Sequence, residues 1–314
     1  MRSDMNAAYG RTRGPILNEP GVLPRPSPRH TGPMTRFPAP PAGGQSHTER
    51  PPDPALRGLV SAVWVQQVAP DAAPYLHRRI PNGAAELVCE LGSPPRVVGP
   101  LTAPLAHVLA PGAVVVGMRF HPGAFAAVAR RPASDLTGLA IDAADVWPAT
   151  APLADAADPR AALAAMRRHV LAHAAGPDPL VSQAVRGLMP WRATDVTSLR
   201  ASLHLSETQL RRRFRAAVGL APKTLHRLLR FQGLLALVQR SIAQGRKPTG
   251  DGIADLALRA GYADQPHLTR ECVRLTGLPP RAFLAETRRS CACGHDHAAS
   301  FAPLLRAEAA ASRA

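Results

Sequence analysis

The sequence predicts an α+β protein with a small β-rich N-terminal domain, a helical connector and an all-α C-terminal domain. Short β-prone runs separated by Gly/Pro turns occupy the first half, Ala-rich segments follow, and capped amphipathic helices fill the last third. The length of 314 residues suits about two domains. We expect the segments 1–50, 51–150, 151–190, 191–290 and 291–314.

The first segment, residues 1–50, is rich in proline and glycine, with nine Pro and six Gly. Proline clusters in runs such as Pro24–Pro28 and Pro38–Pro41, and apolar residues do not recur at a helical or strand period. Such a composition buries too little apolar surface to offset the entropy of ordering the chain. We therefore expect a disordered extension up to residue 50.

The second segment, residues 51–150, has the pattern of a small antiparallel sheet or barrel. Its β-prone runs are Leu59–Val65, Ala85–Leu91, Arg96–Val98 and Ala113–Phe120. The turn sequences between them are Pro81–Gly83, Gly92–Pro95 and Ala110–Gly112. Short strands joined by turns of this kind usually pair with their neighbours, so we expect a compact β-rich domain.

The connector, residues 151–190, is predicted to be helical. An Ala-rich segment, Gly123–Arg130, already precedes it, and Pro159–Ala174 and Leu180–Leu188 lie within it. Asp158 followed by Pro159 is a typical N-cap and first helical residue.

Several residues that could support chemistry are scattered through the β-rich segment. They are His77, Glu86, Cys89, His107 and His121. Nothing in their spacing brings them together, and isolated His and Glu residues near strands are usually core or partly exposed residues. The sequence has no Gly-rich phosphate loop, nucleophile elbow or two-histidine zinc helix. We therefore expect that the protein is not an enzyme.

The positive charge is concentrated in one block. The formal net charge is +16, and residues 191–290 alone hold 18 Lys+Arg against seven acidic residues. A block of this kind attracts polyanions such as DNA, RNA or an anionic membrane. The chain has neither a secretory signal nor the run of about 18 apolar residues that a membrane helix needs, and its four cysteines are too few for a disulfide scaffold. We expect a cytoplasmic protein without a membrane partner.

The basic block contains a repeated pattern of helices. Ser206 with Gln209 forms a capping box, and Leu210, Phe214 and Val218 share one face of the helix that follows. Gly219 ends this helix and Pro222 begins the next.

The same pattern returns 58 residues later. Asp264 replaces Ser206 as N-cap, Leu268 and Cys272 share the buried face, Gly277 ends the helix, and Pro279-Pro280 follows. A short helix precedes each capped helix, and such a pair has the dimensions of a helix-turn-helix unit. An ordinary helical bundle would use similar caps, but two copies in tandem within the basic block favour helix-turn-helix units.

Residues 196–285 resemble the DNA-binding domain of the AraC/XylS family of transcription regulators. The matching stretches are Leu205–Phe214, Gly219–Pro222, Phe231-Gln232, Ile253–Asp264, His267–Arg270 and Thr276–Pro280. The resemblance implies a sequence-specific regulator whose partners are a double-stranded DNA operator, the transcription machinery and a small-molecule effector at a sensing or dimerising N-terminal domain. Pro81–Gly83 and Gly117–Gly123 are similar to an N-terminal module of some of these regulators. Whether the chain forms a homodimer is left open.

The resemblance also implies how DNA is read. The recognition helices would be Glu207–Val218 and Gln265–Leu275, joined by a long helix from Pro222 to Gln239, and would enter successive major-groove segments. Base-reading candidates are Thr208, Arg211, Arg212, Gln265, Thr269 and Arg270. Arginine pairs with guanine and glutamine with adenine. Phosphate-binding candidates are Arg213, Arg215, Lys223 and Arg227.

Two positions depart from the family pattern. Cys272 stands where the family usually has a buried Phe, so the second unit is expected to pack less tightly. Pro266 stands where other members often have a polar base reader, so the second unit is expected to read fewer bases.

The tail, residues 291–314, contains four alternating metal-binding side chains. They are Cys291, Cys293, His295 and His297, ligand types that zinc and copper prefer. In an extended chain all four point to one side, although four alternate ligands make a cramped tetrahedral cage. The alternative hypothesis is therefore a metal- or thiol-responsive regulator; without this tail site we expect no cofactor.

Overall fold

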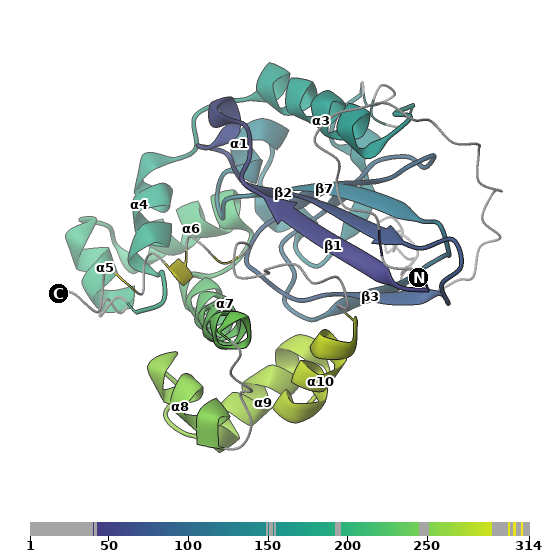
Figure 1. The fold of residues 1–314 in the computed structure, drawn as a ribbon. Helices are drawn as coiled ribbons and strands as arrows, with labels where there is room; N and C mark the ends of the chain where they lie inside the picture. The colour runs from purple at the N-terminus through teal and green to yellow at the C-terminus, as the bar shows by residue number, and fades with distance from the viewer. Residues whose placement is uncertain are drawn as a thin grey trace, which may run out of the picture.

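The structure is a computed structural model that describes residues 40, 43–148, 150, 153, 155–191, 196–244, 251–290, 301, 304, 305 and 309. Its N-terminal half is β-rich and its C-terminal half is helical, so the predicted α+β fold class is confirmed (Figure 1). The strands are β1 (Gln45–Arg50), β2 (Val60–Val68), β3 (Tyr75–Arg79), β4 (Glu86–Glu90), β5 (Arg96–Val98), β6 (Leu105–Leu109), β7 (Val114–Phe120) and β8 (Ala140–Asp142).

The described helices follow and separate the strands. The short 3₁₀ helices are η1 (Pro54–Leu56), η2 (Ala133–Leu136) and η3 (Ala143–Asp145). The α-helices are α1 (Phe125–Ala129), α3 (Pro159–His173), α4 (Pro179–Gly187), α5 (Val196–Ser202), α6 (Glu207–Val218), α7 (Pro222–Ala243), α8 (Asp251–Arg259), α9 (Gln265–Thr276) and α10 (Pro280–Ser290). None of the helices within these described ranges is long and apolar enough to cross a membrane.

Two antiparallel sheets form the N-terminal domain. The larger has six strands in the order β1-β2-β7-β4-β5-β8, and the smaller pairs β3 with β6. All four β-prone runs of the sequence are strands of the larger sheet, so the expectation of an antiparallel sheet is confirmed. Apolar side chains on one face of this sheet pack beneath α1 and α3, and those of the other face pack with the smaller sheet.

The expected boundary at residue 50 is wrong, because residues 45–50 form β1, an edge strand that pairs along its length with β2. The segment Gln-Ser-His-Thr-Glu-Arg has no apolar residue, so hydrophobic periodicity could not reveal it. Its ladder is supported by polar contacts, including Gln66 Nε2 donating to Gln45 Oε1 at 2.6 Å and the Arg119–Glu49 ion pair at 2.8 Å. Residues 1–39 lie outside the described residues.

The connector is helical as expected, but its two main helices belong to different cores. Helix α3 begins at the predicted cap, where Asp158 Oδ1 accepts a hydrogen bond from Ala161 N at 2.8 Å. Met166 and Val170 of α3 are buried in the core of the larger sheet, whereas Val181 and Ala184 of α4 are buried in the C-terminal core. Figure 1 shows α3 over the sheet and α4 beside α6.

The C-terminal domain is built around the 22-residue helix α7. Leu225, Leu228 and Phe231 of α7 are buried at the centre of a core that also contains residues of α5, α6, α8, α9 and α10. Figure 1 shows α5 and α6 on one side of α7 and α8, α9 and α10 on the other. Helix α7 therefore joins two helical units.

Candidate nucleic-acid interface

The first unit consists of α5 and α6, and α6 has the predicted capping box. Ser206 N donates to Gln209 Oε1 at 2.9 Å, and Gln209 N donates to Ser206 Oγ at 3.2 Å. The helix ends at Gly219, whose φ of 80° lies in the left-handed region that favours glycine. These caps fix where α6 starts and stops.

The second unit consists of α8 and α9 and is capped in a similar way. Asp264 Oδ1 accepts a hydrogen bond from His267 N at 2.6 Å, and Pro266 occupies the first turn. The helix ends at Gly277 with a φ of 77°. Because the carboxylate sits at the positive end of the helix dipole, it stabilises the start of α9.

The two units bury equivalent faces. Phe214 of α6 and Cys272 of α9 occupy the same position of the repeat, and their exposed fractions are 0% and 2%. Burial raises the pKa of the Cys272 thiol to about 11, and its Sγ lies 3.7 Å from Thr276 Oγ1. The cysteine is therefore a neutral core residue, as expected for an apolar fit.

Exposed arginines cover the outer face of α6. Thr208, Arg211, Arg212 and Arg215 are all exposed. Arg211 lies 3.6 Å from Glu207 in an i,i+4 pair whose side chains are 65% and 71% exposed, so this pair is weak. These four residues remain accessible to a partner.

Arg213 points to a different part of the protein. Its Nη1 donates to Asp178 Oδ2 at 2.8 Å, which links α6 to the start of α4. This partner could not be predicted from the sequence, since the two residues are 35 positions apart.

On α9, Gln265 and Arg270 are exposed and Thr269 is half-buried. The Thr269 hydroxyl donates to the Gln265 carbonyl at 2.9 Å, so the helix backbone already uses its proton. Pro266 is exposed beside them. Of the three predicted base readers of the second unit, Gln265 and Arg270 therefore have exposed side chains.

The two predicted phosphate-binding residues of α7 differ in exposure. Lys223 is exposed in the first turn. Arg227 is half-buried, with Nε 3.2 Å from Glu271 Oε1 of α9, an approach without hydrogen-bond alignment. Arg227 thus contributes an electrostatic link between α7 and the second unit.

Family models match both domains of the chain. A model described as a helix-turn-helix domain, of the AraC type, matches residues 199–286. The C-terminal domain is therefore an AraC-type helix-turn-helix domain, the kind found in DNA-binding transcription regulators. A second model, described as a domain of unknown function (DUF6597), matches residues 48–142 of this regulator. No curated protein and no solved structure matches the chain.

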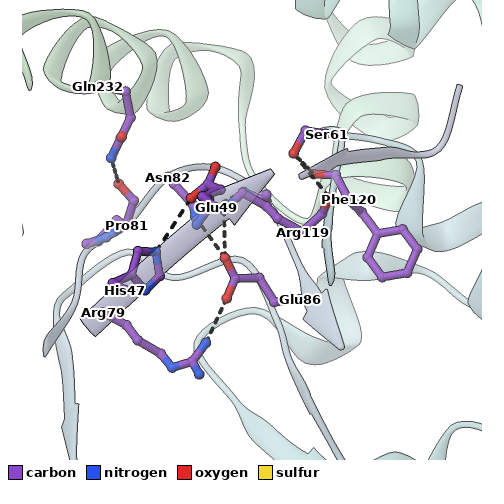
Figure 2. Close-up of polar contacts among 11 residues, drawn as sticks. His47, Glu49, Ser61, Arg79, Pro81, Asn82, Glu86, Arg119, Phe120 and Gln232 are labelled. Carbon is purple, nitrogen blue, oxygen red and sulfur yellow. Dashed lines mark hydrogen bonds and ion pairs between the residues drawn. The ribbon is translucent and has the colours of Figure 1, made fainter. Parts of the chain in front are cut away.

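The N-terminal domain of the regulator contains a buried network of ion pairs around Glu86 (Figure 2). Glu86 accepts hydrogen bonds from Arg79 and Arg119, each at 2.7 Å, and from Asn82 at 3.3 Å. Arg119 also donates to Glu49 at 2.8 Å. Burial alone would raise the pKa values of Glu86 and Glu49. Arg119 and Arg79 oppose this for Glu86, and Arg119 and His47 oppose it for Glu49, so that the net direction of both pKa values is down.

A cluster of rings lies beside this network. His77 and His107 are cross-strand partners of the smaller sheet, with ring centroids 5.1 Å apart, and His77 stacks on Trp64 at 6.3 Å. The Arg79 guanidinium lies 5.0 Å from the centre of a Trp64 ring. Burial and the charge of Arg79 lower the pKa of His77, and they lower that of His107 to about 4. Trp64 Nε1 and His107 Nδ1 are buried without a hydrogen-bond partner in the described part of the chain.

The five scattered residues of the β-rich segment therefore divide into two groups. His77, Glu86 and His107 come together, because β3 and β6 form a sheet that the sequence pattern missed. Cys89 is buried in the core under α3, and burial raises its thiol pKa to about 11. His121 Nε2 lies 3.1 Å from the Arg57 carbonyl oxygen.

Metal binding by the tail stays a prediction. Cys291, Cys293, His295 and His297 lie outside the described residues. Elsewhere, in the ranges that the structure does describe, no group of three or more His, Cys, Asp or Glu side chains is arranged to hold a metal ion. Metal content of the full chain, compared with a truncation after Ser290, would test the tail.

Proposed function

We propose that this regulator binds a bipartite DNA operator by placing α6 and α9 in successive major-groove segments. The observation that carries the proposal is the exposure of the N-terminal halves of both helices, with Arg211 and Arg212 on α6 and Gln265 and Arg270 on α9. Arginine forms bidentate hydrogen bonds with guanine, and glutamine with adenine. Arg215 and Lys223 are exposed beside these residues and suit phosphate oxygens.

The ion pairs of Arg213 and Arg227 limit their part in DNA binding. The pair between Arg213 and Asp178 is half-exposed, so it is weak and Arg213 can exchange its carboxylate for a phosphate. Glu271 is only 9% exposed, so Arg227 would leave a buried carboxylate behind if it turned to DNA. We therefore assign phosphate binding to Arg213, Arg215 and Lys223 and a positioning role to Arg227.

We further propose that the N-terminal domain responds to an effector. The support is the cluster of Trp64, His77 and His107, where two buried polar atoms have no hydrogen-bond partner among the described residues. A ligand that supplied these partners would bind the folded domain preferentially. The lack of enzymatic activity and the cytoplasmic location stay predictions.

Selection of bound sequences from a random DNA pool by the full chain tests the proposed function. We expect enrichment of two short conserved elements whose centres are about one helical turn apart. Enrichment of no sequence, or equal binding of all sequences at low salt, would contradict it.

A further inference from the structure

The two recognition helices end at equivalent positions, and the N-terminal domain contacts both ends. Helix α6 ends at Gly219 and α9 at Gly277, both in the left-handed conformation. In each, the glycine N–H bonds to the carbonyl four residues earlier, Arg215 or Val273. The carbonyl groups at these ends are therefore free to accept hydrogen bonds from another domain.

The end of α6 is held by η2. Thr137 Oγ1 donates to the Gly219 carbonyl at 2.7 Å. A Cβ at Gly219 would lie 2.8 Å from the Ala133 carbonyl oxygen and 2.8 Å from Thr137 Oγ1, so the two backbones are in direct contact. A Cβ at Gly123, just before α1, would lie 3.5 Å from Val218. Thus α1 and η2 both pack against the C-terminal end of α6.

The end of α9 is held by β3. Arg78 Nη1 donates to the Thr276 carbonyl at 3.3 Å. The same guanidinium forms an ion pair with Glu286 of α10, with Nε 3.1 Å from Oε1 and Nη2 3.5 Å from Oε2. A Cβ at Gly277 would lie 3.7 Å from Arg78 Nη1 and 4.0 Å from Pro104 Cγ. One arginine of the N-terminal domain therefore contacts both α9 and α10.

The linking helix α7 is held at a third point. Gln232 Nε2 donates to the Pro81 carbonyl at 3.0 Å, a contact that Figure 2 shows. Leu225 lies directly against Gly83, whose φ is 79° and which has no room for a side chain. Pro81 and Gly83 closely follow Arg78 in the sequence, so the turn after β3 and β3 itself contact α7 and α9 together.

We propose that Thr137 and Arg78 are positioning residues, through which the N-terminal domain fixes the two recognition helices relative to each other. The inference rests on the proposed function, since it concerns how two reading helices match two grooves. Both contacts lie at the C-terminal ends of α6 and α9 and leave the N-terminal halves, with Arg212 and Arg270, exposed. The domain therefore pre-orients the pair of helices without covering the base-reading residues, and pre-orientation lowers the cost of binding both grooves.

The first test measures the distance between the helices without DNA. Ala216 of α6 and Arg274 of α9 are exposed, and each is replaced in the full chain by a ketone-bearing residue that takes a nitroxide label. We expect a narrow distance distribution in the parent and a broad one in the double variant Thr137→Val, Arg78→Ala. Arg57→Ala, which removes an exposed arginine of the same domain, is the matched control and should keep the narrow distribution. An unchanged distribution in the double variant would overturn the inference.

A folding defect is separated from loss of positioning by a second variant. Arg78→Met keeps the length and apolar stem of the side chain but removes the guanidinium that contacts Thr276 and Glu286, and Thr137→Val keeps the side-chain shape. If Arg78→Ala lowers the thermal transition of the chain, the combination Thr137→Val, Arg78→Met is used in its place. This combination should also broaden the distribution while the circular dichroism spectrum stays that of the parent; an unchanged distribution in this folded variant would overturn the inference.

The second test uses the DNA sequence that the parent chain selects. We expect the double variant to bind the two-element operator about tenfold more weakly, because two net hydrogen-bonding contacts are lost, and to bind a single element as the parent does. If the parent selects no sequence, the proposed function fails. If the parent selects an operator and the double variant binds it equally well, only the present inference fails.

Discussion

The two helix-turn-helix units share caps and packing but differ in charge. Helix α6 carries four arginines and one glutamate, whereas α9 carries two arginines and one glutamate. Position by position, Arg211 corresponds to Thr269 and Arg215 to Val273. The first unit is therefore expected to supply most of the electrostatic affinity for DNA.

One pair of equivalent residues has opposite charge. Arg213 of α6 pairs with Asp178 of α4, and its counterpart Glu271 of α9 pairs with Arg227 of α7. At this position the side chain of each unit contacts another helix of the protein, and its charge is complementary to that of the neighbour. The comparison teaches that a charged residue on either of these helices can have an oppositely charged partner within the protein before any DNA is bound.

The largest expected difference between the units concerns their cores. Phe214→Ala should reduce the free energy of unfolding by about 3–5 kcal/mol, because it removes a fully buried ring. Cys272→Ala should cost about 1 kcal/mol, since only a sulfur atom is removed. Chemical denaturation of the two variants, followed by circular dichroism, measures the difference. Equal losses would show that the second unit packs as tightly as the first.

The next expected effect concerns base reading. Arg212→Ala and Arg270→Ala, at equivalent positions, should each weaken operator binding by about 1–3 kcal/mol and relax the preference at one base pair. Titration against operators with single base changes measures this effect. A loss that is the same for every sequence would reassign the residue to a phosphate contact.

Substitution of Arg215 and of Arg227 separates a residue that we expect to contact DNA from one that we expect to act within the protein. Arg227→Ala should destabilise the fold by about 1–3 kcal/mol, because it leaves the buried Glu271 carboxylate without its cation. Arg215→Ala should leave stability unchanged and reduce the salt dependence of DNA binding by about one phosphate contact. Val273→Ala, the counterpart of Arg215 on α9, is the control for the salt dependence and should not change it.

The smallest expected effect is a dependence of stability on pH, which we expect to differ between the two units. Between pH 6.5 and about 4, His107 is neutral in the folded chain but protonated when unfolded, so stability falls as the pH falls. The slope should be below about 1.4 kcal/mol per pH unit for this histidine. The pKa values of Glu49 and Glu86 are lowered in the folded chain, so the stability that these carboxylates contribute is lost at a lower pH. Thermal melts of the parent and of His107→Gln measure the slope, which the variant should reduce.

As the pH falls, the second unit should lose its support before the first does. The reason is that β3 contains both His77, which lies next to His107, and Arg78, which contacts α9. Base preference at the Gln265 and Arg270 positions should therefore weaken at a pH where preference at the Arg212 position is intact. Simultaneous loss at both would mean that the smaller sheet has no particular link to α9.

The caps and apolar spacing of the recognition helices were predictable because they are local. Ser206, Gln209 and Gly219 act within one helix, and the structure confirms each. The edge strand β1 was not predictable, because the polar segment Gln45–Arg50 becomes a strand through its pairing with β2. The pairing of β3 with β6 was not predictable either, because two other strands separate them in the sequence. The partners of Arg213, Arg227 and Arg78 were hidden for the same reason: Arg78 and Glu286 are 208 positions apart.

The central claim is that two recognition helices, held as a pair, read two DNA elements on one face of the duplex. It is tested most directly by inserting about five base pairs, half a helical turn, between the two elements of the selected operator. The account predicts that the full chain then binds on the order of a hundredfold more weakly, because α6 and α9 can no longer meet both elements. Equal affinity for the original and the expanded operator would contradict it.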